Sequence, residues 1–315
     1  MIILAGIDEA GLGPTIGPLA TGCAALRTPG DWLPDSPWER LSIVCCREWR
    51  RGETRLGVAD SKVLHKTGGL EAFEHTLAAF SLLANTKTAC LPLDLPGLGS
   101  ESMPIHPCYS RSLHPFPIYC CEEVISGSVG ALRSALETAG AEVAHLAAAA
   151  LHEPVLNRRF AQGLNKNQAL LLETGRHLAE LAVKFPDSRL CVVVDKQGGR
   201  NDYLPFLTTL FPGCWLETLT IGAEKSSYRV RRSGGDMEIH FTAKADRDSF
   251  ATALASLAAK YVRERAMAEL NAWFCERWPQ VKPTAGYPTD AKRWLAEVAK
   301  IPGKETGLEL LIRER

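Results

Sequence analysis

The sequence predicts an α/β fold in which helices cover a central β-sheet. Two short apolar runs, residues 2–8 and 190–194, have the length and composition of buried strands. Segments whose apolar residues recur at helical spacing alternate with these runs along the chain. Both runs lead directly to an acidic residue, Asp8 in the first and Asp195 after the second, which indicates where a functional site would lie.

The other elements of the first half follow from local composition. Strands are expected at 18–26, after a glycine-rich bend, and more briefly at 42–47, and a helix is expected at 70–83. The proline-rich stretch 91–119 predicts an irregular excursion, and the Ala- and Leu-rich stretch 124–151 predicts a helix.

In the second half the pattern is clearer. Helices are predicted at 165–185 and 250–274, and strands at 228–232 and 237–242 flank a Ser-Gly-Gly-Asp turn that favours a hairpin. No internal repeat, coiled coil or low-complexity tract is present in the sequence.

Composition limits the classes of function. The 315 residues allow one large domain or two, with 36 basic and 36 acidic side chains, so nucleic-acid binding would need a local basic patch. Ten cysteines without a C-x-x-C motif favour reduced thiols in a cytoplasmic protein. The N-terminus lacks the pattern of a signal peptide, and no apolar run is long enough to predict a membrane span.

Three acidic positions stand at ends of predicted elements. Asp8 with its neighbour Glu9, and Asp195, follow strands that would bring them together if the strands are adjacent in the sheet. Asp246 precedes the long helix, where the alternative is a helix N-cap. Converging carboxylates repel one another unless cations lie between them, so the pattern predicts a divalent-metal site. Because adjacent strand residues face opposite ways, Asp8 and Glu9 are expected to share it only if the strand turns at Glu9.

Residues 6–18, GIDEAGLGPTIGP, resemble the opening motif of the type 2 ribonucleases H (ribonuclease HII). Further segments resemble the family's later motifs in the same order, at 59–62 with Leu64, 165–178, 192–195, 244–246 with 255–260, and 285–290. Each match is short, but six in the right order are specific, and together they span most of the chain.

This resemblance implies a ribonuclease H-like fold, with a central mixed sheet flanked by helices and a helical C-terminal extension. It implies a catalytic domain at 1–274, with an insertion at about 92–155 that matches nothing, and an extension at 275–315. The implied activity is endonucleolytic hydrolysis of the RNA strand of RNA–DNA hybrids, leaving 5′-phosphates, with two Mg²⁺ or Mn²⁺ ions.

Carried over by motif, the four catalytic, metal-binding acids would be Asp8, Glu9, Asp195 and Asp246. Asp248 is the alternative candidate for the fourth metal-binding acid. Asp246 is preferred because it lies 14 residues before Lys260, as the motif requires.

The same resemblance implies substrate contacts. Gly11 and Gly13 would let the backbone approach the ribose 2′-hydroxyl, although a simple turn would also place glycines there. Tyr287 would stack on a sugar, the alternative being an ordinary surface tyrosine. Ser61 and Lys62 would contact phosphate, or would form a solvated helix start.

Leu12 departs from the motif, which has arginine at this position. Ribonuclease HIII also lacks that arginine and prefers runs of ribonucleotides, so relaxed preference for single ribonucleotides is expected. Lys196 and Arg200 could replace the lost charge or belong to a solvated loop.

Two other functions stay open at this point: a hybrid-binding paralogue without turnover, and a ribonuclease H-fold nuclease that acts on DNA. The protein is expected to be a monomer without membrane association.

Overall fold

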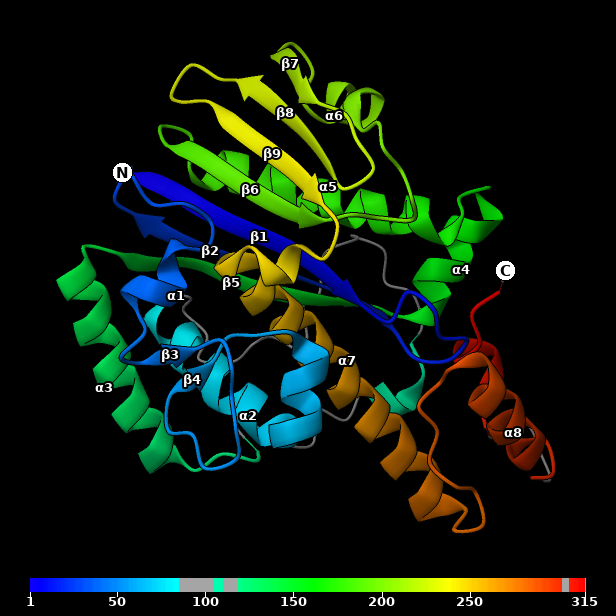
Figure 1. The fold of residues 1–315 in the computed structure, drawn as a ribbon. Helices are drawn as coiled ribbons and strands as arrows, with labels where there is room; N and C mark the ends of the chain where they lie inside the picture. The colour runs from blue at the N-terminus through cyan, green and yellow to red at the C-terminus, as the bar shows by residue number, and fades with distance from the viewer. Residues whose placement is uncertain (85–104, 110–117, 302–305, 315) are drawn as a thin grey trace.

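A seven-stranded mixed sheet forms the centre of the computed structural model, which describes residues 1–84, 105–109, 118–301 and 306–314. The strand order is β5-β2-β1-β6-β9-β8-β7 (Figure 1). The strands are β1 (Ile2–Ala10), β2 (Leu19–Thr28), β5 (Glu142–Leu151), β6 (Arg189–Asp195), β7 (Trp215–Thr220), β8 (Lys225–Arg231) and β9 (Met237–Thr242). β6 is parallel to both β1 and β9, and the other neighbours are antiparallel.

Helices cover both faces of this sheet (Figure 1). The first face carries α1 (Ser36–Arg40), α2 (Ser61–Leu83), α3 (Glu122–Ala139) and α7 (Phe250–Arg277), and the second carries α5 (Lys166–Lys184) and α6 (Leu204–Leu210). α4 (Glu153–Ala161) and α8 (Pro288–Val298) lie toward one end, and β3 (Cys45–Cys46) pairs with β4 (Leu56–Gly57) apart from the main sheet. Short 3₁₀ turns occur at Pro107–Tyr109, Ala245–Arg247 and Leu308–Leu310.

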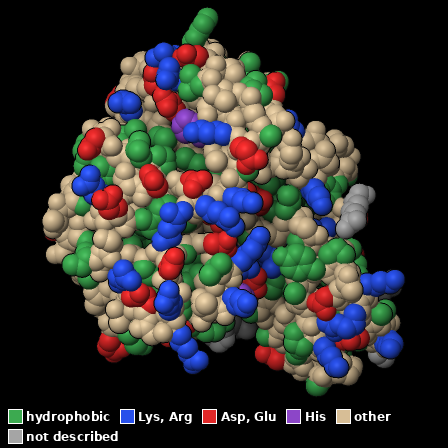
Figure 2. Space-filling model, in the orientation of Figure 1, with side chains coloured by type: hydrophobic (Ala, Val, Ile, Leu, Met, Phe, Trp, Pro, Cys, Tyr) green, Lys and Arg blue, Asp and Glu red, His purple; other side chains and the backbone are tan. Residues whose placement is uncertain are grey.

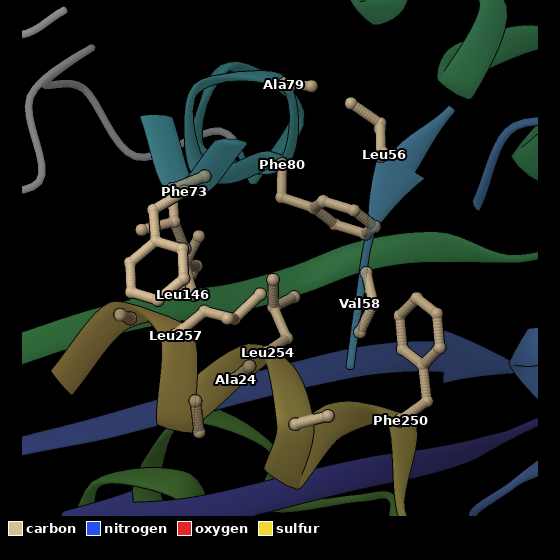
Figure 3. Close-up of a cluster of buried hydrophobic side chains, with 14 of the residues drawn as sticks. Ala24, Leu56, Val58, Phe73, Ala79, Phe80, Leu146, Phe250, Leu254 and Leu257 are labelled. Atoms are coloured by element: carbon tan, nitrogen blue, oxygen red, sulfur yellow. The ribbon is translucent and has the colours of Figure 1, made fainter. Parts of the chain in front are cut away.

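The core on the first face is built from apolar side chains of several elements. Phe73 of α2 points toward Leu257 of α7, with Leu146 of β5 beside them, and Phe80 of α2 points toward Val58 (Figure 3). All five side chains are buried. This core fixes α7 against the sheet.

α7 approaches β1 and β2 unusually closely because glycines face it. A Cβ on Gly6 would lie 2.0 Å from the amide nitrogen of Thr252, and one on Gly22 would lie 2.1 Å from the carbonyl oxygen of Ala255. Gly22 pairs with Asp8 in the sheet, so this contact brings the side of α7 to the carboxyl end of β1.

The predicted helix at 124–151 is wrong in its second half. α3 ends at Ala139, Gly140 caps it with a left-handed φ of 65°, and residues 142–151 form the edge strand β5. Val143, Leu146 and Ala148 of this strand pack in the core that α7 shares. Alanines are small enough for a strand that lies beneath a closely packed helix. In the sequence, however, an alanine-rich stretch predicts a helix.

Most other elements agree with the sequence. The predicted helix at 165–185 is α5, capped by a reciprocal Asn165–Gln168 box, and the hairpin is β8–β9. The helix expected at 70–83 starts earlier, at Ser61, and changes direction at Gly69. The excursion expected at 91–119 lies largely outside the described residues. The division of the chain near residue 274 stays a prediction.

Two compositional expectations can be compared with the structure. The nine cysteines in the described part of the chain are all free thiols. Among the described helices, none combines the length and the apolar character needed to cross a bilayer.

Candidate active site

Three of the predicted acids meet at the carboxyl ends of β1 and β6. These two strands are parallel neighbours, and their pairing ends with Ile7 opposite Val194. The next residues, Asp8 and Asp195, therefore lie side by side. Asp8, Glu9 and Asp195 each offer a carboxylate oxygen, and these oxygens lie within 4.8 Å of one another. The two apolar strands are therefore adjacent, which is the condition on which the convergence of their acids depended.

Glu9 joins this group without the turn that the sequence led us to expect. β1 stays paired with β2 through Ala10, and the left-handed residue that ends it is Gly11, with a φ of 86°. On the other side, the pairing of β1 with β6 stops at Ile7, so the last residues of β1 are held along one edge only. The amide of Glu9 donates to Oδ1 of Asp8 at 2.7 Å.

Burial and mutual repulsion make the three acids resist ionisation together. Burial raises the pKa of Asp8 well above its usual value, and the charges of Glu9 and Asp195 add to the shift. Burial, followed by the charge of Asp195, raises the pKa of Glu9 to about 7. Burial also raises the pKa of Asp195, although the amide of Ala245 donates to its Oδ1 at 2.9 Å.

This donor set fits a hard divalent cation. Carboxylate oxygens are the ligands that Mg²⁺ and Mn²⁺ prefer, and a cation between the acids would remove their repulsion. Lys62 supplies a nearby positive charge that lowers the pKa of both Glu9 and Asp195. A single lysine cannot neutralise three carboxylates, so the cluster has the chemistry of a metal site.

Asp246 lies beside this group of three. It is half-buried in the 3₁₀ turn before α7, and burial and then the charges of Asp60 and Asp195 raise its pKa. The alternative role of helix cap is wrong, because Ser249 caps α7 and accepts from the amide of Thr252 at 3.2 Å. Asp248, the competing acid, is exposed.

Sequence reasoning missed two groups that adjoin the acids. Asp60 caps α2 by accepting from the amide of Lys62 at 2.9 Å, and its charge reaches Asp246. The hydroxyl of Ser256 of α7 hydrogen-bonds Asp8 and lies 3.1 Å from the hydroxyl of Ser61. Ser61 is therefore buried rather than a solvated helix start. Both residues lie within segments that resemble the family motifs, Asp60 in 59–62 and Ser256 in 255–260, but neither of them was assigned a role from the sequence.

The glycine bend and Tyr287 are brought together beside the acids. A Cβ on Gly11 would lie 2.6 Å from the side chain of Arg263, and one on Gly13 would lie 4.0 Å from Cε1 of Tyr287. Tyr287 is 51% exposed, and the guanidinium of Arg263 lies 5.4 Å from its ring centroid. The amides of Thr15 and Ile16, just after the bend, both donate to the carbonyl oxygen of Gly286.

Leu12 is half-buried in this bend. It packs against an apolar cluster formed by Leu19, Leu151, Leu156, Ala169 and Leu170. Leu12 and Gly13 also line a pocket of about 530 Å³, whose other walls include Phe160, Lys166 and Arg313. The leucine thus has apolar partners on one side and an open pocket on the other.

Lys196 does not replace the missing arginine. Its ammonium group donates to Oδ1 of Asn201 at 2.8 Å and to the carbonyl oxygens of Gly222 and Ala223. These hydrogen bonds hold Lys196 against the loops that contain Asn201 and Gly222. Arg200 is exposed and lies 5.9 Å from the ring of Tyr203. Elsewhere, lysine and arginine side chains cross the middle of the face drawn in Figure 2, with acidic ones among them.

A mixed sheet with helices on both faces, and carboxylates at the ends of its adjacent parallel strands, defines a ribonuclease H-like α/β fold. A crystal structure of a mutant of Bst-RNase HIII matches with a TM-score of 0.52 and 17% identity, over 99% of this chain. The matched region is 66% of that protein, so this chain spans slightly less than two thirds of its length.

Two further structures are similar over almost the whole chain. One is RNase HII from Archaeoglobus fulgidus in a PCNA complex, with a TM-score of 0.43, 17% identity and coverage of 100% of this chain and 95% of that one. The other is Bst-RNase HIII in complex with Mn²⁺, with a TM-score of 0.48, 15% identity and coverage of 99% and 66%. The fold assignment depends on the structure of the Bst-RNase HIII mutant alone. It confirms the fold that the sequence resemblance implied. The chain matches no protein-family model and no curated protein.

We expect the metal-free protein to lose stability as the pH rises from about 4.5 to about 7. In this range the folded protein keeps a proton on Glu9, whose pKa is about 7, and the unfolded chain has released it near 4.5. The folded state then binds more protons than the unfolded state, so its free energy of unfolding falls with rising pH. Urea unfolding in EDTA at pH 5 and pH 8 measures this loss.

Mn²⁺ should restore stability at pH 8, and Glu9→Gln should reduce the pH dependence in EDTA without abolishing it, because the pKa values of Asp8, Asp195 and Glu153 are also raised. A pH dependence that is the same in Glu9→Gln and in the unaltered protein would contradict the assignment to Glu9.

Proposed function

We propose that this protein is an endonuclease that hydrolyses the RNA strand of RNA–DNA hybrids and leaves 3′-hydroxyl and 5′-phosphate ends. The observation that carries the proposal is the cluster of Asp8, Glu9 and Asp195 at the ends of two parallel strands. The Gly11–Gly13 bend follows this cluster in the chain, and Gly13 lies next to Tyr287. Acids that would hold metal are thereby followed in the chain by groups suited to contacting a ribose.

Asp8, Glu9 and Asp195 would hold Mg²⁺ or Mn²⁺, with Asp246 as the fourth ligand at the rim. A bound pair of ions would activate water and stabilise the leaving oxygen of the scissile phosphate. The protein's own groups orient these ligands: Ser256 and the amide of Glu9 hydrogen-bond Asp8, and the amide of Ala245 holds Asp195. Lys62 adds positive charge where the phosphate would lie.

The bend and Tyr287 would recognise the substrate. Exposed Gly13 leaves the backbone accessible for a hydrogen bond to the 2′-hydroxyl, which distinguishes RNA from DNA, and Gly11 supplies the left-handed turn that presents it. The half-exposed ring of Tyr287, 4.0 Å from the position that a Gly13 Cβ would take, can stack on a neighbouring sugar. Buried Ser61 would act by fixing Ser256, whereas exposed Lys62 can reach a phosphate.

The experiment that tests the proposal uses end-labelled duplexes in which one strand is all RNA, all DNA, or DNA with one or four ribonucleotides. With Mg²⁺ or Mn²⁺, the protein should cleave only the strands that contain ribonucleotides. Cleavage of all-DNA or branched DNA instead would identify another type of ribonuclease H-fold nuclease. Tight hybrid binding without cleavage under either metal would identify a non-catalytic hybrid-binding protein.

We further expect runs of four ribonucleotides to be cleaved much faster than a single one, because Leu12 offers no charge to the junction. Leu12→Arg should raise single-ribonucleotide cleavage by about tenfold, which corresponds to about 1.4 kcal/mol, near the lower end of a hydrogen bond to a charged group. The arginine stem can cover the apolar cluster while its guanidinium reaches the pocket.

Leu12→Met is the matched control, since it keeps the apolar packing and adds no charge. It should leave the preference for runs unchanged. If Leu12→Arg impairs cleavage of every duplex equally, the leucine is a packing residue and does not set specificity.

A further inference from the structure

The bend between residues 11 and 17 begins and ends at glycines in left-handed conformations. The φ angle is 86° at Gly11 and 92° at Gly17. Glycines are conformationally permissive, so the bend has little intrinsic rigidity and depends on outside contacts for its shape. Several of these contacts come from residues distant in sequence.

Arg313 makes the most extensive of these contacts. Its Nε and Nη2 donate to the carbonyl oxygen of Gly17 at 2.8 and 2.5 Å, and its Nη1 donates to the carbonyl oxygen of Gly11 at 2.6 Å. The amide of Arg313 also donates to the carbonyl oxygen of Thr15 at 2.9 Å. One residue therefore holds both ends and the middle of the bend.

The guanidinium of Arg313 is buried near an acidic side chain. Arg313 is only 8% exposed, and the fully buried Glu153 provides a nearby opposite charge. Burial lowers the pKa of Arg313 to about 10, which leaves it protonated at neutral pH. Oε1 of Glu153 in turn accepts from the amide of Gly17 at 2.8 Å and from the hydroxyl of Tyr109 at 2.9 Å.

A buried charge is costly, so it needs a full set of hydrogen bonds. The planar fork of arginine can bridge two carbonyl oxygens in a fixed geometry, which the single ammonium of lysine cannot reproduce. Here the fork joins the two flexible ends of the segment that carries Leu12 and Gly13. Leu12 and Gly13 lie three and four positions after Glu9, and a Cβ on Gly13 would lie 4.0 Å from Cε1 of Tyr287.

We propose that Arg313 is a positioning residue for substrate recognition: its guanidinium fixes the carbonyls of Gly11 and Gly17 and so holds the bend in the shape that meets the ribose. This inference rests on the proposed hybrid substrate. Arg313, about 300 residues later in the chain, would thus supply the rigidity that the glycines lack.

The test compares Arg313→Lys with the matched control Arg232→Lys. Arg232 also donates to several backbone carbonyls, those of Ala182, Phe185, Ser188 and Gly235, but at the hairpin end of the sheet. Hydrogen–deuterium exchange without substrate should show amides in residues 11–17 exchanging at least about tenfold faster in Arg313→Lys. The Arg232→Lys protein should show no change there. Unchanged exchange in Arg313→Lys would overturn the proposal.

Kinetics then test whether this rigidity serves recognition. On the all-RNA hybrid, kcat/KM of Arg313→Lys should fall at least about tenfold, mainly through KM, while the shift of Tm caused by Mn²⁺ stays unchanged. An equal fall in Arg232→Lys, a lost Mn²⁺ shift, or faster exchange with unaltered kinetics would each overturn the proposal. Failure of the proposed function is seen separately, because the unaltered protein would then cleave no hybrid.

Discussion

Replacing Asp8 with asparagine is expected to lower turnover on an RNA–DNA hybrid by at least about a thousandfold, while the protein still binds the hybrid. Asparagine keeps the shape of the side chain but removes one charge from three carboxylates whose oxygens lie within 4.8 Å of one another. Metal-assisted stabilisation of the transition state depends on that charge. Asp195→Asn should behave in the same way, since it removes the ligand that ends β6.

Turnover is measured with saturating hybrid and Mg²⁺ or Mn²⁺, and binding is measured by fluorescence anisotropy in Ca²⁺. Asp236→Asn serves as the control, because Asp236 pairs with Arg231 in the hairpin and lies outside the acid cluster. It should keep full turnover. Undiminished cleavage in EDTA, or by either cluster variant, would exclude the metal mechanism.

The parts of the site that the sequence predicted are those with a local signal. Asp8 and Asp195 follow apolar strands, and parallel neighbours in a sheet bring such ends together. The glycines of the bend and Tyr287 belong to short motifs that keep their order along the chain. The proximity of Gly13 and Tyr287 in the structure agrees with the roles that the motifs imply.

The parts that were missed depend on contacts between distant segments. β5 was taken for a helix because its alanines carry no strand signal until α7 packs against them. Arg313 donates hydrogen bonds to a bend about 300 residues earlier in the chain, and no periodicity or composition predicts such a contact. Ser256 lies in the 255–260 motif, but its contact with Asp8 forms only because Gly22 allows α7 to approach the sheet. Tertiary packing, rather than local preference, fixed all three.

The choice between Asp246 and Asp248 gives the second large effect. We expect Asp246→Ala to lower hybrid cleavage by at least about a hundredfold, and Asp248→Ala to keep most of the activity. Asp246 is half-buried and close enough to Asp195 for their charges to interact, whereas Asp248 is exposed at the end of the 3₁₀ turn. A ligand at the rim of the cluster would contribute to holding the second ion, so its loss should cost less than that of Asp8.

Initial rates on the all-RNA hybrid over a range of Mn²⁺ concentrations measure this difference. The loss in Asp246→Ala should be smaller at high Mn²⁺, because mass action partly compensates for a weakened site. Asp246→Asn distinguishes charge from packing, since it keeps the side-chain volume and should be nearly as impaired as alanine. If Asp248→Ala is the inactive variant instead, the motif is aligned two residues out of register at the start of α7. Asp195 would then have its metal-binding partner on the exposed side of the turn.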